Sequence, residues 1–146
     1  MSDAEAPPDR ATSGRPSVRP MIQRDRASNA LGMEVERDQP GWATVSMRVR
    51  DDMINGFGIT HGGIVFAVAD TAFALACNED DAVTVAAGAD IVFLAPTRAG
   101  QTLIADAHRR SRAGRSGVYD VTVSDETGQV VAEFRGRSLA ARPGGR

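Results

Sequence analysis

The chain has 146 residues, enough for one domain with a hydrophobic core and too few for two ordinary domains. Its 17 basic and 19 acidic residues nearly balance, so the charge favours neither a nucleic acid nor an acidic substrate as a partner. Every basic residue is arginine, which excludes Schiff-base chemistry on a lysine. Cys77 is the only cysteine, so a disulfide within the chain is excluded and a reducing compartment is expected.

The N-terminal segment has no apolar stretch behind its charges, which argues against a signal peptide. The longest apolar run is shorter than the roughly 20 residues that a membrane helix needs. We therefore expect a cytoplasmic protein that makes no membrane contact. Residues 1–20 are rich in Pro, Ser, Asp and Arg, which predicts a disordered tail. The domain is expected over residues 21–142, followed by a short tail over residues 143–146.

The first part of the domain predicts a helix and two strands. Residues 21–31 are compatible with a helix that ends at Gly32. Residues 33–37 predict a short strand, which a turn at Pro40-Gly41 connects to a second strand over residues 42–49. The alternation of this second strand assigns its apolar positions to Trp42, Val45, Met47 and Val49.

A loop over residues 51–60 leads to a long helix expected over residues 61–77, and only strands follow it. These strands are expected over residues 83–94, 102–112, 118–124 and 130–140, with Glu126-Thr127-Gly128 as a tight hairpin between the last two. This order of elements predicts an α+β fold in which an antiparallel sheet wraps around one central helix. The open edge of such a sheet predicts an oligomer.

Asp70 is the one charge within the apolar helix. Its position well inside the helix excludes a role as the N-cap. A buried carboxylate is costly unless it is paired or used, so we interpret Asp70 as a functional group rather than a structural one. None of the residues expected on its helix face can neutralise it: Gly63, Phe66, Ala67, Phe73, Ala74 and Cys77.

Gly62 and Gly63 stand at the expected start of the same helix, where free amides and the helix dipole favour negative charge. Two glycines also form an ordinary tight turn, but an amide here is suited to polarise a carbonyl. Gly62 and Asp70 are eight positions apart, or roughly 12 Å along a helix. One carbonyl cannot contact both groups of one chain, so we predict a two-fold dimer that brings Gly62 of one chain to Asp70 of the other.

Other polar residues leave alternatives open. Asn55 either holds the loop before the helix or hydrogen-bonds a substrate carbonyl. His61 and His108, the only histidines, lack a metal-ligand spacing, so no metal site is expected. Cys77 is interpreted as an inert buried thiol. The arginines of the hairpin around residues 109–115, Arg112 and Arg115 among them, form either a solvated face or a docking surface for phosphates.

Taken together, the segment HGGIVFAVADTAFALACN resembles the signature of the hotdog-fold acyl-CoA thioesterases of the phenylacetic-acid degradation (PaaI) type. The similarity covers residues 21–140 and extends to the segments ALGMEV, MINGFG, FLAPTRAG, GVYDVTV and FRGRS. It implies a hotdog fold, a homodimer that pairs into a homotetramer, and hydrolysis of acyl-CoA thioesters without a cofactor.

The resemblance also implies roles for single residues. Asp70 becomes the catalytic carboxylate, as general base or nucleophile, and Gly62 of the partner subunit becomes the amide donor to the thioester carbonyl. Asn55 would hold that carbonyl or the attacking water, and His61 would support the turn. Many relatives carry a hydroxyl that assists the water on the strand after the helix. Residues 87–89 have none, so this role is vacant or passes to Thr71 or Thr84.

The expected substrate is an aromatic acyl-CoA of the phenylacetyl or hydroxyphenylacetyl kind, used in phenylacetate degradation. We expect its acyl group to contact aromatic walls, and the candidate substrate-binding residues are Phe57, Ile59, Gly63, Phe66, Thr71 and Phe73. Three alternatives stay open: a thioesterase for medium-chain aliphatic acyl-CoA, an acyl-CoA-binding protein without catalysis, and a hydratase or dehydratase with His61 as its acid/base.

Overall fold

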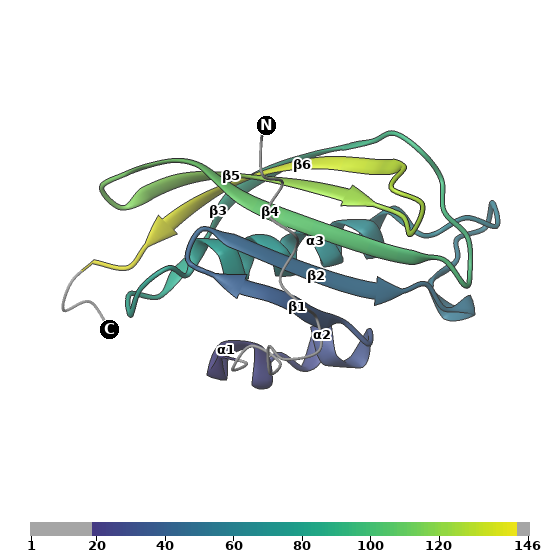
Figure 1. The fold of residues 1–146 in the computed structure, drawn as a ribbon, viewed down its shortest axis with the longest axis horizontal. Helices are drawn as coiled ribbons and strands as arrows, with labels where there is room; N and C mark the ends of the chain where they lie inside the picture. The colour runs from purple at the N-terminus through teal and green to yellow at the C-terminus, as the bar shows by residue number, and fades with distance from the viewer. Residues whose placement is uncertain (1–18, 143–146) are drawn as a thin grey trace, which may run out of the picture.

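The computed structural model describes residues 19–142 of the chain (Figure 1). The tails predicted over residues 1–20 and 143–146 lie outside this range, apart from Arg19 and Pro20. Pro20 begins helix α1 (Pro20–Gln23), and the Arg19 guanidinium donates two hydrogen bonds to Asp38, at 2.7 and 2.6 Å. These two residues therefore belong to the folded part rather than to the predicted tail.

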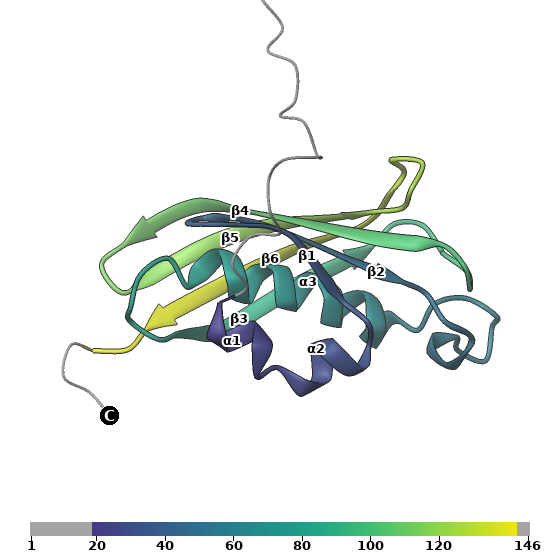
Figure 2. The same cartoon turned by 60° about the horizontal axis from the view of Figure 1, so that its bottom comes forward.

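Six antiparallel strands form one sheet in the order β1-β2-β4-β5-β6-β3. The sheet curves around the long helix α3 (Gly62–Cys77), as the views in Figures 1 and 2 show. This confirms the predicted α+β hotdog architecture. The strands are β1 (Glu34–Gln39), β2 (Trp42–Arg48), β3 (Thr84–Phe93), β4 (Thr102–Ala113), β5 (Ser116–Ser124) and β6 (Val130–Ala140). A 3-10 helix, η1 (Asp51–Met53), lies between β2 and α3.

The single helix predicted over residues 21–31 is wrong, because two short helices occupy this segment. Helix α2 (Arg26–Ala30) follows α1 after a break at Asp25. Asp25 has an extended backbone, and its side chain accepts a hydrogen bond from the Ser28 amide at 2.8 Å. An aspartate that caps a helix in this way must stand outside it, so one continuous helix is impossible. Gly32, with a φ of 74°, ends the segment as predicted.

The core lies between α3 and the concave face of the sheet. In β2 its members are Ala43, Val45 and Met47, each at most 1% exposed, whereas Trp42 is 36% exposed on the opposite face. The prediction that Trp42 shares the apolar face of this strand is therefore wrong. The Trp42 ring stacks on His108 at 5.0 Å, and the Arg37 guanidinium lies 3.8 Å above it. The strand period of two places small Ala43, rather than large Trp42, against the helix.

Two neighbouring surfaces of the protomer stay open. Strand β3 ends the sheet order, and within residues 19–142 its only neighbouring strand is β6. Large apolar side chains at and beside it are exposed: Val83, Val85, Val92, Phe93 and Leu94. One face of α3 is also only partly covered, and it carries Gly63, Phe66, Ala67, Asp70 and Ala74. No helix within residues 19–142 has the length and apolar character needed to cross a bilayer.

Candidate active site

The turn into α3 leaves one amide hydrogen without an acceptor in the described part of the chain. The His61 amide donates to the Met53 carbonyl at 2.8 Å, and the Gly63 amide donates to Nδ1 of His61 at 2.9 Å. The next amide along the helix, that of Ile64, donates to the His61 carbonyl at 2.9 Å. The Gly62 amide makes no hydrogen bond within residues 19–142. It therefore stands free at the positive end of the helix dipole.

A side chain at position 62 would crowd this turn. A Cβ built on Gly62 meets the edge of the Phe93 ring at 3.2 Å. Phe93 is 54% exposed, so its ring must shift only slightly to admit a methyl group. The turn thus tolerates a small side chain at position 62, and the free amide does not depend on glycine there.

Asn55 organises the loop that precedes the turn. Its Oδ1 accepts hydrogen bonds from the amides of Phe57 at 2.9 Å and Ile59 at 3.3 Å. Its backbone amide donates to the Ile59 carbonyl at 2.8 Å. The first of the two predicted roles, holding the loop, is therefore confirmed. Its Nδ2 group makes no hydrogen bond within residues 19–142, so it stays available as a donor.

Asp70 is half-buried on the open face of α3. Its carboxylate has neither a hydrogen bond nor an ion pair within residues 19–142. Burial raises the pKa of this carboxyl group, and the negative charge of Asp25 raises it further. A carboxylate that is poorly solvated and unpaired is a stronger base than an ordinary aspartate.

The structure brings some of the predicted site residues together and separates others. Asn55, His61 and Gly62 lie at the N-terminal end of α3, joined by the loop and turn. Asp70 is eight residues further along the same helix, or about 12 Å at 1.5 Å per residue. Within one protomer the free amide and the carboxylate are therefore too far apart to contact one carbonyl.

The predicted aromatic walls have different environments. Phe57 is 89% exposed at the tip of the loop. Phe66 is partly buried on the open face of α3, with its ring edge-on to Phe134 at 5.3 Å. Phe73 is 1% exposed in the core, packed against Tyr119 and Phe134, so its prediction as a pocket wall is wrong. Phe66 and Phe73 lie on the same predicted face of the helix, but only Phe73 is fully buried in the core. Helical periodicity alone could not distinguish these two positions.

Both hydroxyls proposed to assist the water have protein partners. The Oγ1 atom of Thr71 lies 2.9 Å from Oγ of Ser28, and Thr71 is only 8% exposed. The Thr84 hydroxyl donates to the Ala82 carbonyl at 3.3 Å. Neither hydroxyl projects from the open face of α3 that carries Asp70.

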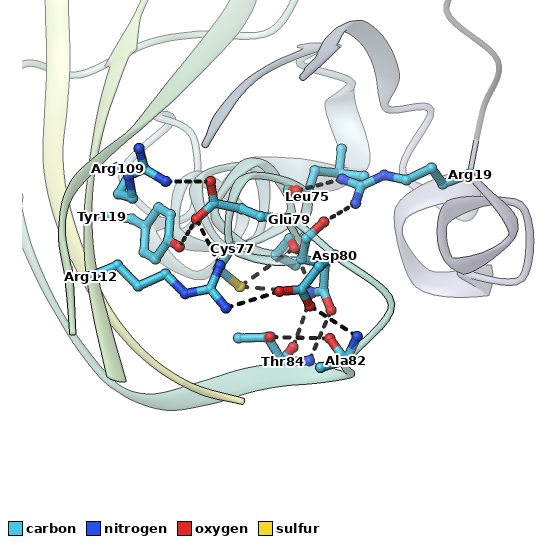
Figure 3. A network of polar contacts seen from close by, with 12 residues as sticks. Arg19, Leu75, Cys77, Glu79, Asp80, Ala82, Thr84, Arg109, Arg112 and Tyr119 are labelled. Atoms are coloured by element: carbon cyan, nitrogen blue, oxygen red, sulfur yellow. Dashed lines mark hydrogen bonds and ion pairs between the residues drawn. The ribbon is translucent and has the colours of Figure 1, made fainter. Parts of the chain in front are cut away.

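The arginines of the β4–β5 hairpin are only partly free, as Figure 3 shows for two of them. Arg109 and Arg112 pair with Glu79 at 2.8 and 3.6 Å, and Arg112 also pairs with Asp80 at 3.1 Å. Arg115 uses only Nε, which donates to the Ala140 carbonyl at 2.9 Å. Arg112 is therefore held by two acidic partners, whereas most of the Arg115 guanidinium stays available.

Sequence reasoning missed residues that support the site from other elements. Glu79, just past the end of α3, accepts hydrogen bonds from Arg109 at 2.8 Å and from the Tyr119 hydroxyl at 2.5 Å, and so ties the helix to β4 and β5. Ser28 contacts Thr71 from α2. These contacts join residues far apart in the sequence, so no local sequence pattern predicts them. An Asp followed three residues later by Ser, as at Asp25 and Ser28, could have predicted the helix cap.

Comparisons with known proteins assign the fold to the thioesterase superfamily. The model of the thioesterase superfamily matches residues 57–132, more than half of the chain. The acyl-coenzyme A thioesterase PaaI of Escherichia coli is 42% identical over 118 residues, which cover 81% of this chain and 84% of that protein. The chain belongs to the thioesterase superfamily, and within it to the PaaI type.

Solved structures give the same result. The E. coli PaaI protein from the phenylacetic acid degradation operon superposes with a TM-score of 0.81 and 40% identity, covering 84% of this chain and 88% of that one. A Streptococcus mutans protein bound to acetyl CoA superposes with a TM-score of 0.71 and 25% identity, covering 75% and 88% of the two chains. The family resemblance predicted from the sequence is thus confirmed.

Proposed function

We propose that this acyl-CoA thioesterase of the PaaI type hydrolyses aromatic acyl-CoA at a site made by two subunits. The observation that carries the proposal is the pair formed by the unused Gly62 amide and the unpartnered Asp70 carboxylate on one helix. The first is suited to bind a negative oxygen, and the second is suited to take a proton. Hydrolysis of a thioester needs both.

The proposed reaction begins with the thioester carbonyl oxygen against the Gly62 amide. Asp70 takes a proton from a water molecule as the water oxygen adds to the carbonyl carbon, and the oxyanion forms against the amide. Collapse of this intermediate breaks the C–S bond and releases CoA as a thiolate. A thiol has a pKa of about 8.5, so its thiolate leaves without a strong general acid. Direct attack by Asp70, through an acyl-enzyme anhydride, uses the same two groups.

A two-fold dimer supplies the geometry that one protomer lacks. The exposed Phe93 at the end of β3 lies against Gly62 at the start of α3, so a second copy on the open face of α3 would also cover this end of β3. With the two α3 helices antiparallel, Gly62 of the partner subunit approaches Asp70, and a second, equal site forms. Pairing of two such dimers gives the proposed homotetramer.

The acyl group would contact Phe66 on α3 and Phe57 of the loop. Phe57 is 89% exposed in the protomer, so it becomes a pocket wall only when a partner covers it. Ring–ring contact contributes about 0.5–1.5 kcal/mol beyond burial, which favours a phenylacetyl group over an alkyl chain of equal size. The operon of the similar E. coli protein supports phenylacetate degradation as the setting.

Release of CoA from a panel of acyl-CoAs, followed with a thiol-reactive dye, tests the proposal. Cys77 is 2% exposed and burial raises the pKa of its thiol to about 11, so we expect it to react far more slowly with the dye than CoA does. We expect release that is fastest with phenylacetyl- or hydroxyphenylacetyl-CoA. Faster release from medium-chain alkyl thioesters would replace the aromatic assignment. Tight binding of acyl-CoA without release of CoA would indicate a binding protein. Addition of water to a double bond of the acyl group would indicate a hydratase.

A further inference from the structure

Helix α2 contacts the catalytic helix beside Asp70. Ser28 of α2 and Thr71 of α3 are 5% and 8% exposed, and their hydroxyl oxygens lie 2.9 Å apart. Thr71 follows Asp70 directly in the chain. Figure 2 shows α2 next to α3, on the side away from the sheet. This buried polar contact links helix α2 to the residue next to the proposed base.

The direction of each hydrogen bond follows from the chemistry of the three groups. The Ser28 hydroxyl donates to Oδ2 of Asp25 at 2.6 Å, because a carboxylate only accepts. The single Ser28 proton is thus used, so the Thr71 hydroxyl donates to Ser28. The Ser28 amide donates to Oδ1 of Asp25 at 2.8 Å. Both oxygens of Asp25 are therefore fixed, and its charge is held in one place next to α3.

The other elements packed against α3 bring no comparable charge to Asp70. The buried side chains of β2, β4, β5 and β6 are apolar or hydroxyl-bearing, and β3 packs Ala89 and Ile91 against the core. On β1, Asp38 is paired with Arg19 and Arg37 lies over Trp42. On α3 itself, the charge of Asp70 acts on the buried Cys77 thiol, and burial raises the pKa of that thiol to about 11. The Arg19 guanidinium donates to the Leu75 and Asn78 carbonyls at the far end of the helix. In the proposed dimer the turn at His61 of the partner subunit would also approach Asp70.

We propose that Asp25 is a positioning residue for the reaction: held by Ser28 against Thr71, its carboxylate keeps a second negative charge next to the stretch of α3 that carries Asp70 and so favours proton uptake by Asp70. This rests on the proposed role of Asp70. The raised pKa of the Asp70 carboxyl group, to which the Asp25 charge contributes after burial, agrees with it. A cap of α2 alone needs only the bond to the Ser28 amide, which an uncharged asparagine makes equally well.

The test is the ionisation of Asp70 in the wild type, Asp25→Asn and Ser28→Ala. The carboxyl pKa is read by carbon-13 NMR titration of the whole protein, with Asp70→Asn to assign the signal, and the acid limb of kcat/KM against pH is recorded in parallel. Asparagine keeps the cap and removes the charge. Ser28→Ala keeps the charge and the backbone cap and removes the link to Thr71.

We expect Asp25→Asn to lower the pKa of Asp70, to move the acid limb to lower pH, and to reduce the plateau of kcat/KM severalfold. Ser28→Ala keeps the charge of Asp25, so its acid limb should lie at the same pH as that of the wild type. An Asp70 pKa that is the same in Asp25→Asn and the wild type overturns the inference. If Asp25→Asn does not fold, Asp25→Ser, which also caps, gives the same comparison.

Failure of the proposed function gives a different result. In that case Asp70→Asn keeps its activity, while the NMR titration still reports whether Asp25 acts on Asp70. An acid limb that moves in Asp25→Asn without a change in the Asp70 signal would assign the limb to another group and would also overturn the inference.

Discussion

Nδ1 of His61 accepts the hydrogen bond of the Gly63 amide at 2.9 Å, and this leaves the Gly62 amide as the free donor of the turn. An imidazole that accepts at Nδ1 carries its proton on Nε2, so the contact also fixes the tautomer of His61. The side chain of His61 therefore caps α3 and selects which glycine amide faces a bound group.

Gly62→Pro tests that amide directly. Position 62 is the first of α3, where proline is well tolerated because its missing N–H has no helical partner. We expect kcat to fall about 10²–10³-fold, the loss typical of a removed oxyanion donor, with the fold retained. Gly62→Ala is the matched control: it adds a Cβ against Phe93 and keeps the N–H, so its activity should stay close to that of the wild type. Equal losses in the two variants would indicate a steric effect instead.

Asp70→Asn tests the carboxylate by activity and by stability. We expect turnover to fall about 10²–10⁴-fold, the usual contribution of a general base. Asp120→Asn is the control, since Asp120 lies on β5 and pairs with Arg135 on the sheet surface. If Asp70→Asn has the same turnover as Asp120→Asn, Asp70 takes no part in the reaction.

The stability of the same variant should depend on pH in a defined direction. The pKa of Asp70 is higher in the folded than in the unfolded state, so ionisation opposes folding. Above the folded pKa the charge destabilises the wild type, and below the unfolded value, about 3.9, it does not. Asp70→Asn should therefore raise the Tm at pH 7, and the gain should disappear in acid. A gain that is constant with pH would contradict the raised pKa.

The sequence predicted the parts of the fold whose signals are local. The hairpin at residues 126–128 and the strand Val130–Ala140 have their predicted bounds, and α3 begins one residue after the predicted start because His61 is its cap. Gly62 and Asp70 were found because a turn and a lone charge stand out in an apolar segment. The face of β2 on which Trp42 lies and the burial of Phe73 are both set by packing against residues distant in sequence. The periodicity of the local sequence does not predict such contacts.

Arg115→Glu tests whether the β4–β5 hairpin binds the CoA phosphates. We expect a raised KM for acyl-CoA and an unchanged KM for a short pantetheine thioester that lacks the nucleotide. Arg115→Gln, which removes the charge without reversing it, should give a smaller rise. Equal effects on both thioesters would leave Arg115 as a solvated side chain.

The same reversal at Arg112 should raise the KM for acyl-CoA too, but it also disturbs the fold. Glu79 and Asp80 would face a third carboxylate after Arg112→Glu, so we expect a lower Tm as well. The KM ratio of the two thioesters, measured at a temperature well below the Tm, separates the two effects. An unchanged Tm would show that these ion pairs contribute little.

The central claim, that each site takes Asp70 from one subunit and Gly62 from the other, is tested by mixing inactive variants. Asp70→Asn and Gly62→Pro chains are co-expressed with different tags, and the heterodimer is isolated by tandem purification. One of its two sites then combines an intact Asp70 with an intact Gly62, so the account predicts about half of the wild-type activity per dimer. A heterodimer of the wild type with the Asp70→Asn/Gly62→Pro double variant has no intact shared site and should be inactive. The opposite pair of results, an inactive first heterodimer and a half-active second one, would place both groups in the site of a single chain and contradict the account.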